Sequence, residues 1–162
     1  MLCNIESMKL DSIDIRILDI LQQNAELQTA EIAQQVGLST TPCWRRIQRL
    51  KDAGVISRQV ALLDAQKVNV GVTVFVSVRT SIHSQEWFES FKATVQAIPE
   101  VVEFYRMSGD VDYLLRVVVP DIAAYDRVYK RLIAGTQLHD VSSSFAMEEL
   151  KLTTALPLGY VG

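Results

Sequence analysis

The order in which apolar periodicity changes after residue 71 constrains the fold of this chain more than any other feature. Valines occupy every second position from Val72 to Val78, which is the period of a strand. The same patterns predict helix 86–97, strands 101–107 and 113–119, a helix opened by Pro120 and Asp121, and a last strand 141–152. Strand, helix, strand, strand, helix, strand is the ferredoxin-like order, in which both helices cover one face of a four-stranded sheet.

Each predicted helix of this half has one apolar stripe that should face the sheet. In the first helix the stripe consists of Trp87, Phe88, Phe91 and Val95. In the second helix the residues expected to point inward are Ile122, Tyr125, Tyr129, Leu132 and Ile133. Spacings of three and four residues place such side chains on one side of a helix.

The predicted strands carry apolar side chains on both faces of the sheet. Phe75 lies between the alternating valines, and strand 113–119 contains the adjacent pairs Leu114–Leu115 and Val117–Val118. Because the helices cover only one face, a monomer would expose a large apolar surface to water. We therefore expect a homo-oligomer, at least a dimer, built through the second face of the sheet.

From Asp11 to Asp52 the chain has helical periodicity instead. An apolar stripe predicts a helix from Asp11, and a second, shorter helix is expected after an N-cap at Thr29. Gly37 can adopt the left-handed conformation of a tight turn, and Ser39 can cap the helix that follows. Two helices joined by such a turn are typical of a helix-turn-helix.

The third helix, predicted over residues 40–52, has two different sides. Cys43, Ile47 and Leu50 lie at positions i, i+4 and i+7 and form the buried side. The residues predicted to contact DNA, from the outward side and its flanks, are Ser39, Thr40, Thr41, Trp44, Arg45, Arg46, Gln48, Arg49 and Lys51. Such side chains bind phosphates and the edges of bases in the major groove. A merely solvated helix face is the alternative, and the preceding turn favours DNA binding.

The positive charge needed for DNA binding must be local, because the whole chain has a net charge of −3. The third helix has four basic residues and a single acid, Asp52. We expect base edges to be read by Arg45, Gln48 and Arg49. We expect phosphates to be contacted by Arg46 and Lys51.

The two halves define the predicted domains. Residues 55–63 are predicted to form a β segment in the position of a wing, and residues 64–71 a short polar linker. We therefore expect an α+β chain with a winged helix-turn-helix DNA-binding domain over residues 1–63. A ferredoxin-like βαββαβ domain for effector binding and oligomerisation should then occupy residues 72–162.

Other classes of function are disfavoured. No apolar run approaches the roughly 18 residues of a membrane span, and no basic start followed by an apolar stretch indicates a secretion signal. We therefore expect a cytoplasmic protein without a membrane partner. Cys3 and Cys43 lie in no metal-binding cluster, and His83 and His139 are isolated. We expect neither a metal nor a cofactor.

The predicted turn between the two middle strands contains Gly109, Asp110 and Asp112. Backbone N–H groups around a glycine turn can hold a carboxylate, and an aspartate can bind an ammonium group, so the turn suits an amino acid. Asp-Gly sequences also form ordinary turns without a ligand, and on these residues alone that alternative stays open. A catalytic pair is disfavoured because no histidine, nucleophile or metal cluster accompanies the two acids. We therefore expect no enzyme.

Several stretches of both halves resemble the Lrp/AsnC (feast/famine) family of regulators. They are VGLSTTPC at 36–43, RRI at 45–47, ALLD at 61–64, SGDVDYLL at 108–115 and SSSFAM at 142–147. The resemblance covers nearly the whole chain. It implies a winged helix-turn-helix joined to an effector domain, dimers that assemble further, commonly into octamers, and an amino acid bound between dimers.

By position, the resemblance places the effector on Met107, Ser108, Gly109, Asp110, Val111, Asp112, Ser143, Ser144 and Phe145. We therefore predict a sequence-specific transcription regulator that binds double-stranded DNA and responds to a small amino acid through its assembly. One alternative is an amino-acid-sensing module whose helical half binds protein instead of DNA. Another is a small ferredoxin-like enzyme.

Overall fold

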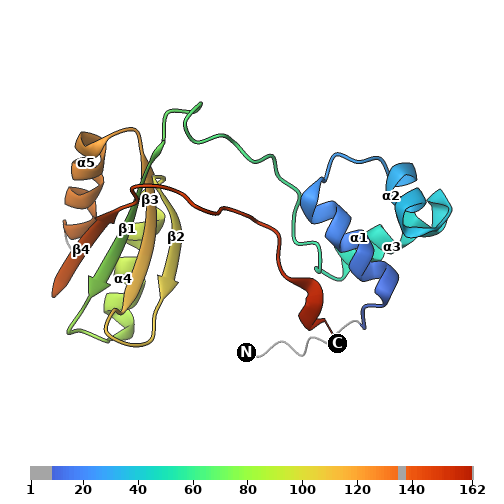
Figure 1. The fold of residues 1–162 in the computed structure, drawn as a ribbon. Helices are drawn as coiled ribbons and strands as arrows, with labels where there is room; N and C mark the ends of the chain where they lie inside the picture. The colour runs from blue at the N-terminus through green and yellow to red at the C-terminus, as the bar shows by residue number, and fades with distance from the viewer. Residues whose placement is uncertain (1–8, 135–137, 162) are drawn as a thin grey trace. The chain divides into compact units, whose positions relative to one another are not determined.

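The computed structural model describes residues 9–134 and 138–161 and divides into two compact units (Figure 1). One unit contains the chain up to Ala61 together with the tail from Lys151 onward, and the other is Leu62–Leu150. The tail was expected in the C-terminal domain. It groups with the N-terminal helices because the Gln22 side-chain amide donates to the Leu156 carbonyl (3.0 Å) and accepts from the Leu156 N–H (2.9 Å). The first eight residues of the predicted N-terminal domain lie outside the described residues.

Three helices build the N-terminal unit: α1 Ser12–Gln23, α2 Thr29–Val36 and α3 Thr40–Asp52. The predicted bounds of α3 are confirmed. The predicted N-cap of α2 is wrong, because Gln28 occupies that position and its backbone N–H donates to the Glu31 side chain, as in a capping box. One small core holds the three helices together through Ile17, Ile32, Ala33, Val36, Cys43, Ile47 and Leu50.

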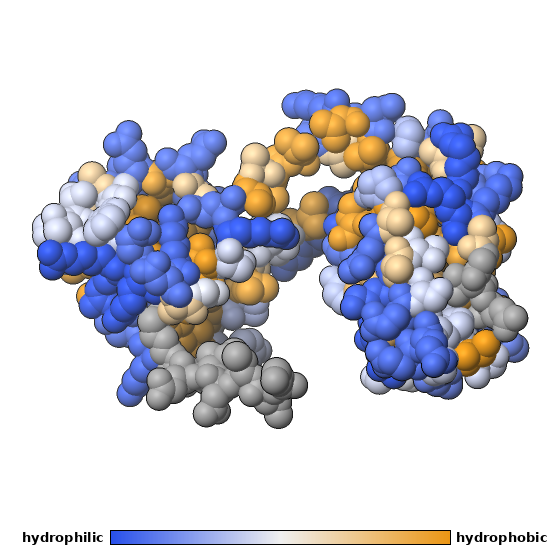
Figure 2. Space-filling view, turned by 180° about the vertical axis from the view of Figure 1, so that it is seen from behind, coloured by the Kyte–Doolittle hydropathy of each residue, from blue (hydrophilic) through white to orange (hydrophobic). Residues whose placement is uncertain are grey.

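The predicted wing strand is also wrong, since no strand is assigned in residues 55–63, all of which the structure describes. The Ile56 N–H still bonds to the Leu50 carbonyl at the end of α3. Beyond it, a strand would need a partner for its backbone groups, and none of the described strands pairs with this segment. Its apolar side chains, Val60, Leu62 and Leu63 among them, are exposed, and Figure 2 shows apolar atoms along this connecting segment.

The C-terminal unit contains β1 Val72–Arg79, α4 Gln85–Gln96, β2 Val101–Arg106, β3 Tyr113–Val119, α5 Ile122–Ile133 and β4 Asp140–Phe145. The strands pair antiparallel in the order β2-β3-β1-β4, which confirms the ferredoxin-like prediction. The last strand ends at Phe145 and not near residue 152. Phe145 pairs with Val74, close to the start of β1. Residues after Phe145 therefore have almost no residues of β1 left to pair with.

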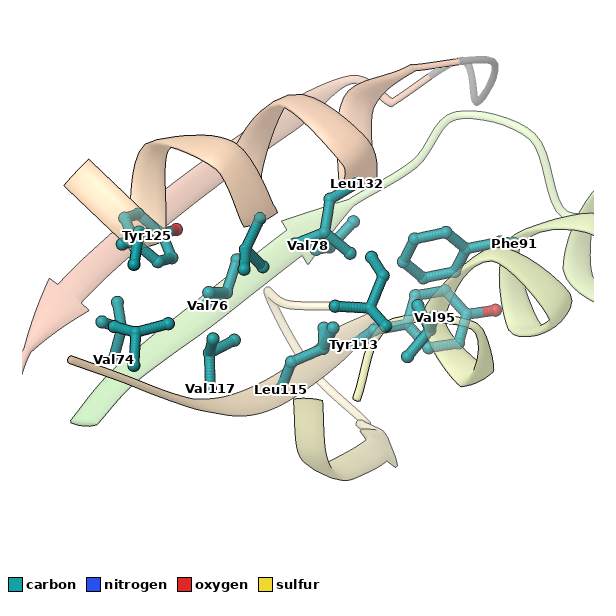
Figure 3. Close-up of a cluster of buried hydrophobic side chains, with 14 residues drawn as sticks. Val74, Val76, Val78, Phe91, Val95, Tyr113, Leu115, Val117, Tyr125 and Leu132 are labelled. Carbon is teal, nitrogen blue, oxygen red and sulfur yellow. The ribbon is translucent and has the colours of Figure 1, made fainter. Parts of the chain in front are cut away.

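Both helices pack on one face of this sheet (Figure 3). Alternate residues of β1 and β3 point toward Phe91 and Val95 of α4 and toward Tyr125 and Leu132 of α5. The prediction was wrong for Ile122, which is 70% exposed, and for Ile133, which is also exposed. The inward stripe of α5 instead consists of Ala124, Tyr125, Val128 and Leu132.

The opposite face of the sheet, the helix-free face, is covered by none of the described helices. A cross-strand ion pair lies on it, with Arg116 Nη2 2.6 Å from Glu103 Oε1. This bond holds the pKa of the Glu103 carboxyl below its usual value. Around the pair, the partly or fully exposed apolar side chains are Phe75, Tyr105, Leu114 and Val118.

Candidate DNA-binding surface and effector site

Helix α3 is positioned by the turn before it and by its own apolar side. Gly37 ends α2 with a φ of 75°, a left-handed conformation that glycine adopts without strain. Ser39 is the N-cap of α3, as predicted, although its side chain makes no capping hydrogen bond. Cys43, Ile47 and Leu50 are buried, as expected. The opposite side of α3 must therefore face away from the small core.

The outward side of α3 exposes Thr41, Trp44, Arg45 and Lys51, and Gln48 is half-buried. Trp44 is 54% exposed, which is a large apolar area for a helix in water. Within the described residues, Arg45 and Lys51 make no side-chain hydrogen bond or ion pair with another part of the chain. Two free cations beside an exposed indole ring are suited to phosphates and base edges.

The two other arginines of α3 are engaged by Asp14, a fully buried residue of α1. Arg46 Nη1 donates to Asp14 Oδ1 at 2.8 Å and to Asp11 Oδ2 at 2.7 Å. Arg49 Nη2 donates to Asp14 Oδ2 at 2.5 Å. Both carboxylate oxygens of Asp14 therefore bind α3, and this contact, the Asp14 clamp, fixes α3 against α1.

The Asp14 clamp changes the protonation behaviour of its neighbours. The Asp14 backbone N–H and the Arg46 guanidinium hold the pKa of the Asp11 carboxyl below its usual value. In turn, hydrogen bonds to Asp11 and Asp14 raise the pKa of Arg46. These charges stabilise one another within the unit. Arg46 and Arg49 are therefore less available for phosphate contacts than the exposed Arg45 and Lys51.

Sequence reasoning missed Asp14, although a signal was present. Asp14 lies one turn before Leu18 and Ile17, on the apolar stripe of α1, where a charged residue requires a partner. Arg46 and Arg49 are three residues apart on α3 and can therefore reach one carboxylate together. An acid on the apolar stripe of one helix, together with two arginines on the same side of another helix, indicates a contact between the two helices.

The predicted effector turn, residues 107–112, joins β2 to β3 at one end of the sheet. Gly109 has a φ of 114°, and the Met107 N–H donates to the Asp112 carbonyl at 2.8 Å. Asp112 Oδ2 accepts the Thr80 N–H at 2.8 Å, so this side chain fastens the loop after β1. Asp110 is exposed and makes no side-chain hydrogen bond or ion pair within the described residues. Asp110 is therefore the freer of the two acids for a ligand.

The remaining predicted effector residues lie on β4, at the other edge of the sheet. Ser143 hydrogen-bonds to the Tyr125 hydroxyl, and the Phe145 ring contacts Tyr125 edge-on with a centroid distance of 5.3 Å. Ser144 pairs with Phe75 and lies on the helix-free face. In the order β2-β3-β1-β4, β1 separates this strand from the effector turn, by about 10 Å from β3 to β4. The chain by itself does not bring the two groups of residues together.

Two further observations concern other kinds of site. Over residues 9–134 and 138–161, no group of three His, Cys, Asp or Glu side chains is arranged to hold a metal ion. Among the helices the structure describes, none is both long and apolar enough to cross a membrane.

Comparison with known proteins gives two matches to family models. The model of the winged helix-turn-helix DNA-binding domain matches residues 10–57, and that of the Lrp/AsnC ligand binding domain matches residues 73–156. The chain belongs to the Lrp/AsnC family. The family and the fold predicted from the sequence are thus confirmed, and the chain is a DNA-binding transcriptional regulator.

Individual Lrp/AsnC relatives match over almost the whole chain. The DNA-binding transcriptional activator DecR of Escherichia coli is 49% identical over 150 residues, covering 92% of this chain and 99% of DecR. The crystal structure of an AsnC family regulator from Agrobacterium tumefaciens matches with a TM-score of 0.90 and 64% identity, covering 93% of this chain and 99% of that one. A regulator from Neisseria meningitidis, solved in complex with L-Met, matches with a TM-score of 0.88 and 38% identity, covering 93% and 97%.

Proposed function

We propose that this Lrp/AsnC regulator reads its operator mainly through Arg45 and Gln48 of α3, with Lys51 on a phosphate. The exposure of Arg45 without a partner in the described chain carries this proposal, because the neighbouring Arg46 and Arg49 are held by the Asp14 clamp. Ser39, Thr40 and Thr41 lie at the start of α3, where backbone N–H groups favour a phosphate. Trp44 lies beside them and can contact a thymine methyl group.

The proposed assembly begins with a dimer formed through the helix-free face. A dimer presents two copies of α3 to successive turns of the major groove, and multivalent binding strengthens a modest single-site affinity. Further association of dimers, up to an octamer, would align more operator half-sites. Because the relatives are named as transcriptional regulators, we propose that this protein works in the cytoplasm and has no enzymatic activity.

The proposed effector is a small amino acid held by the turn 107–112. Asp110 would bind its ammonium group, and backbone N–H groups beside Gly109 its carboxylate. Because Ser143, Ser144 and Phe145 lie at the opposite edge of the sheet, we propose that they come from a neighbouring subunit. An amino acid held between subunits would then change how the subunits assemble, and so the spacing of the α3 helices on DNA.

Replacing Arg45 with alanine should weaken specific DNA binding by about 1–3 kcal/mol, the usual contribution of a base-reading arginine. Fluorescence anisotropy measures this with a duplex selected by the wild-type protein from random DNA. Arg127→Ala is the matched control, since it removes the same charge from an exposed position on α5. Equal affinities of the Arg45 variant and wild type would refute the assignment.

A binding constant insensitive to salt would favour the protein-interaction alternative, because phosphate contacts weaken steeply with added salt.

Replacing Asp110 with asparagine should abolish most of the thermal stabilisation that the effector provides. A ligand at a hundred times its dissociation constant stabilises the folded state by about 2.7 kcal/mol. A thermal-shift screen of the twenty amino acids, including L-methionine, identifies the effector on the wild-type protein. Glu86→Gln, an exposed acid on α4, is the control. An unchanged shift in the Asp110 variant would remove this residue from the site.

A further inference from the structure

A pair of adjoining hollows lies along α4 and the edge strand β2, and it includes none of the residues assigned above, although Arg106 and Tyr113 flank the turn 107–112. The larger has a volume of about 410 Å³ and is lined by residues of α4, β2 and Tyr113. The smaller, about 130 Å³, lies at the N-terminal end of α4 and includes His83 and Ser84. Phe88, Arg106 and Tyr113 line both hollows, so the two meet at these side chains. We call them together the α4–β2 hollow.

The walls of the α4–β2 hollow are aromatic and already packed. The Tyr113 ring lies 6.1 Å from Phe88, 5.6 Å from Phe104 and 5.3 Å from Phe91, measured between ring centroids. Val95 adds an aliphatic wall farther along α4. Preformed apolar walls of this kind can bind a compact apolar group without the entropy cost of ordering their side chains.

The charge at the junction of the hollow is positive. Arg106 is exposed, and its side chain has no hydrogen bond or ion pair with any described residue. Glu103, the acid that also lines the hollow, accepts two bonds from Arg116 and is therefore neutralised. Lys92 lies over the Phe88 ring and is 3.6 Å from Glu89. The cation left without a partner is thus Arg106, at the mouth of an apolar hollow, and the dipole of α4 reinforces it.

We infer that the α4–β2 hollow binds a small monocarboxylic acid with a branched aliphatic or aromatic body. Its carboxylate would pair with the Arg106 guanidinium, and its body would lie against Phe88, Phe104 and Val95. One free cation and apolar walls favour a single negative charge over a phosphate group. Among the described residues that line the hollow, none offers a free acid to an ammonium group, so the hollow should prefer a simple carboxylic acid, whereas the turn around Asp110 should prefer an amino acid.

The test uses Trp87, which lines the smaller hollow, as the reporter. The chain has two tryptophans, so Trp44→Phe leaves Trp87 as the only one. Titration of this full-length variant with 4-methylpentanoate should give a saturable change in fluorescence. The alcohol with the same carbon skeleton, 4-methylpentan-1-ol, should bind at least about tenfold more weakly, because it lacks the charge that pairs with arginine.

Arg106→Met keeps the aliphatic stem of the exposed arginine and should also weaken binding of the acid about tenfold or more. Arg127→Met, which removes a cation from α5, should leave it unchanged. No saturable response of the Trp44→Phe protein would overturn the inference. So would equal affinities of acid and alcohol, or equal affinities of the Arg106 and Arg127 variants. None of these outcomes depends on DNA binding or on the amino-acid effector, so the inference fails or stands separately from the proposed function.

Discussion

Asp14→Asn should destabilise the helix-turn-helix unit by about 2–3 kcal/mol. Removing one partner of a fully buried ion pair costs about 3–5 kcal/mol, because the remaining charge is left uncompensated. The side chains of Arg46 and Arg49 are 27% and 50% exposed, so water can compensate for part of the loss. Asparagine has nearly the shape of aspartate, so the change removes the negative charge without opening a cavity. Urea unfolding of a Trp87→Phe background, in which Trp44 on α3 is the sole tryptophan, measures the stability of this unit.

Asp11→Asn is the matched control for this experiment. Asp11 also bonds to Arg46, but its side chain is half exposed, and asparagine is as good an N-cap as aspartate. The control should therefore cost less than about 1 kcal/mol, as exposed ion pairs do. Equal destabilisation by the two variants would mean that the Asp14 clamp does not hold α3.

The Asp14 variant also separates two explanations of DNA affinity. Removing an acid makes the unit more positive and frees two arginines, so simple electrostatics predicts tighter binding to DNA. If the Asp14 clamp sets the direction of α3, the same variant should bind its operator more weakly, and the difference from random DNA should shrink. Anisotropy titrations with operator and random duplexes show whether the Asp14 variant binds DNA more tightly or more weakly than the wild type.

The parts of the fold that were predictable from the sequence are those with strong local signals. The bounds of β3 and α3 agree with the prediction because a terminal signal marks each of them, Pro120 directly after β3 and Ser39 directly before α3. The strand order followed from the succession of elements, since few topologies accept it. The position of Asp112 was also predictable, but its bond to the Thr80 N–H was not, because the two residues are distant in the sequence.

The predictions that were wrong concern features that depend on contacts with other parts of the chain. Residues 55–63, after Gly54, were predicted to form a strand in the position of a wing, but a strand also needs a neighbour for its backbone groups. Ile122 was predicted to point inward, but it lies at the first position of α5 and is exposed. The side chains of α5 that face the sheet include Ala124 and Val128 instead. The Gln22–Leu156 contact joins residues 134 apart, which no local pattern can reveal.

Phe75→Asp should convert the regulator to a monomer and lower its operator affinity by about 10²–10⁴-fold, the usual gain from linking two binding modules. Phe75 lies on the helix-free face and is 40% exposed in the single chain. In β1 it pairs with Arg116, so Leu114 and Val118 flank it on β3. An aspartate in this apolar surface would have to lose its water on dimerisation, and the cation opposite it, Arg116, is already bonded to Glu103.

Light scattering gives the mass of the assembly, and anisotropy gives the affinity for DNA. Ile122→Asp is the matched control, because Ile122 is a more exposed apolar residue on the helix side, and an acid in the first turn of α5 favours the helix. If the dimer forms through the helix-free face, only the Phe75 variant should dissociate. A Phe75 variant that remained dimeric would place the interface elsewhere. In that case the separation of the turn 107–112 from β4 would have to be bridged by a different arrangement of subunits.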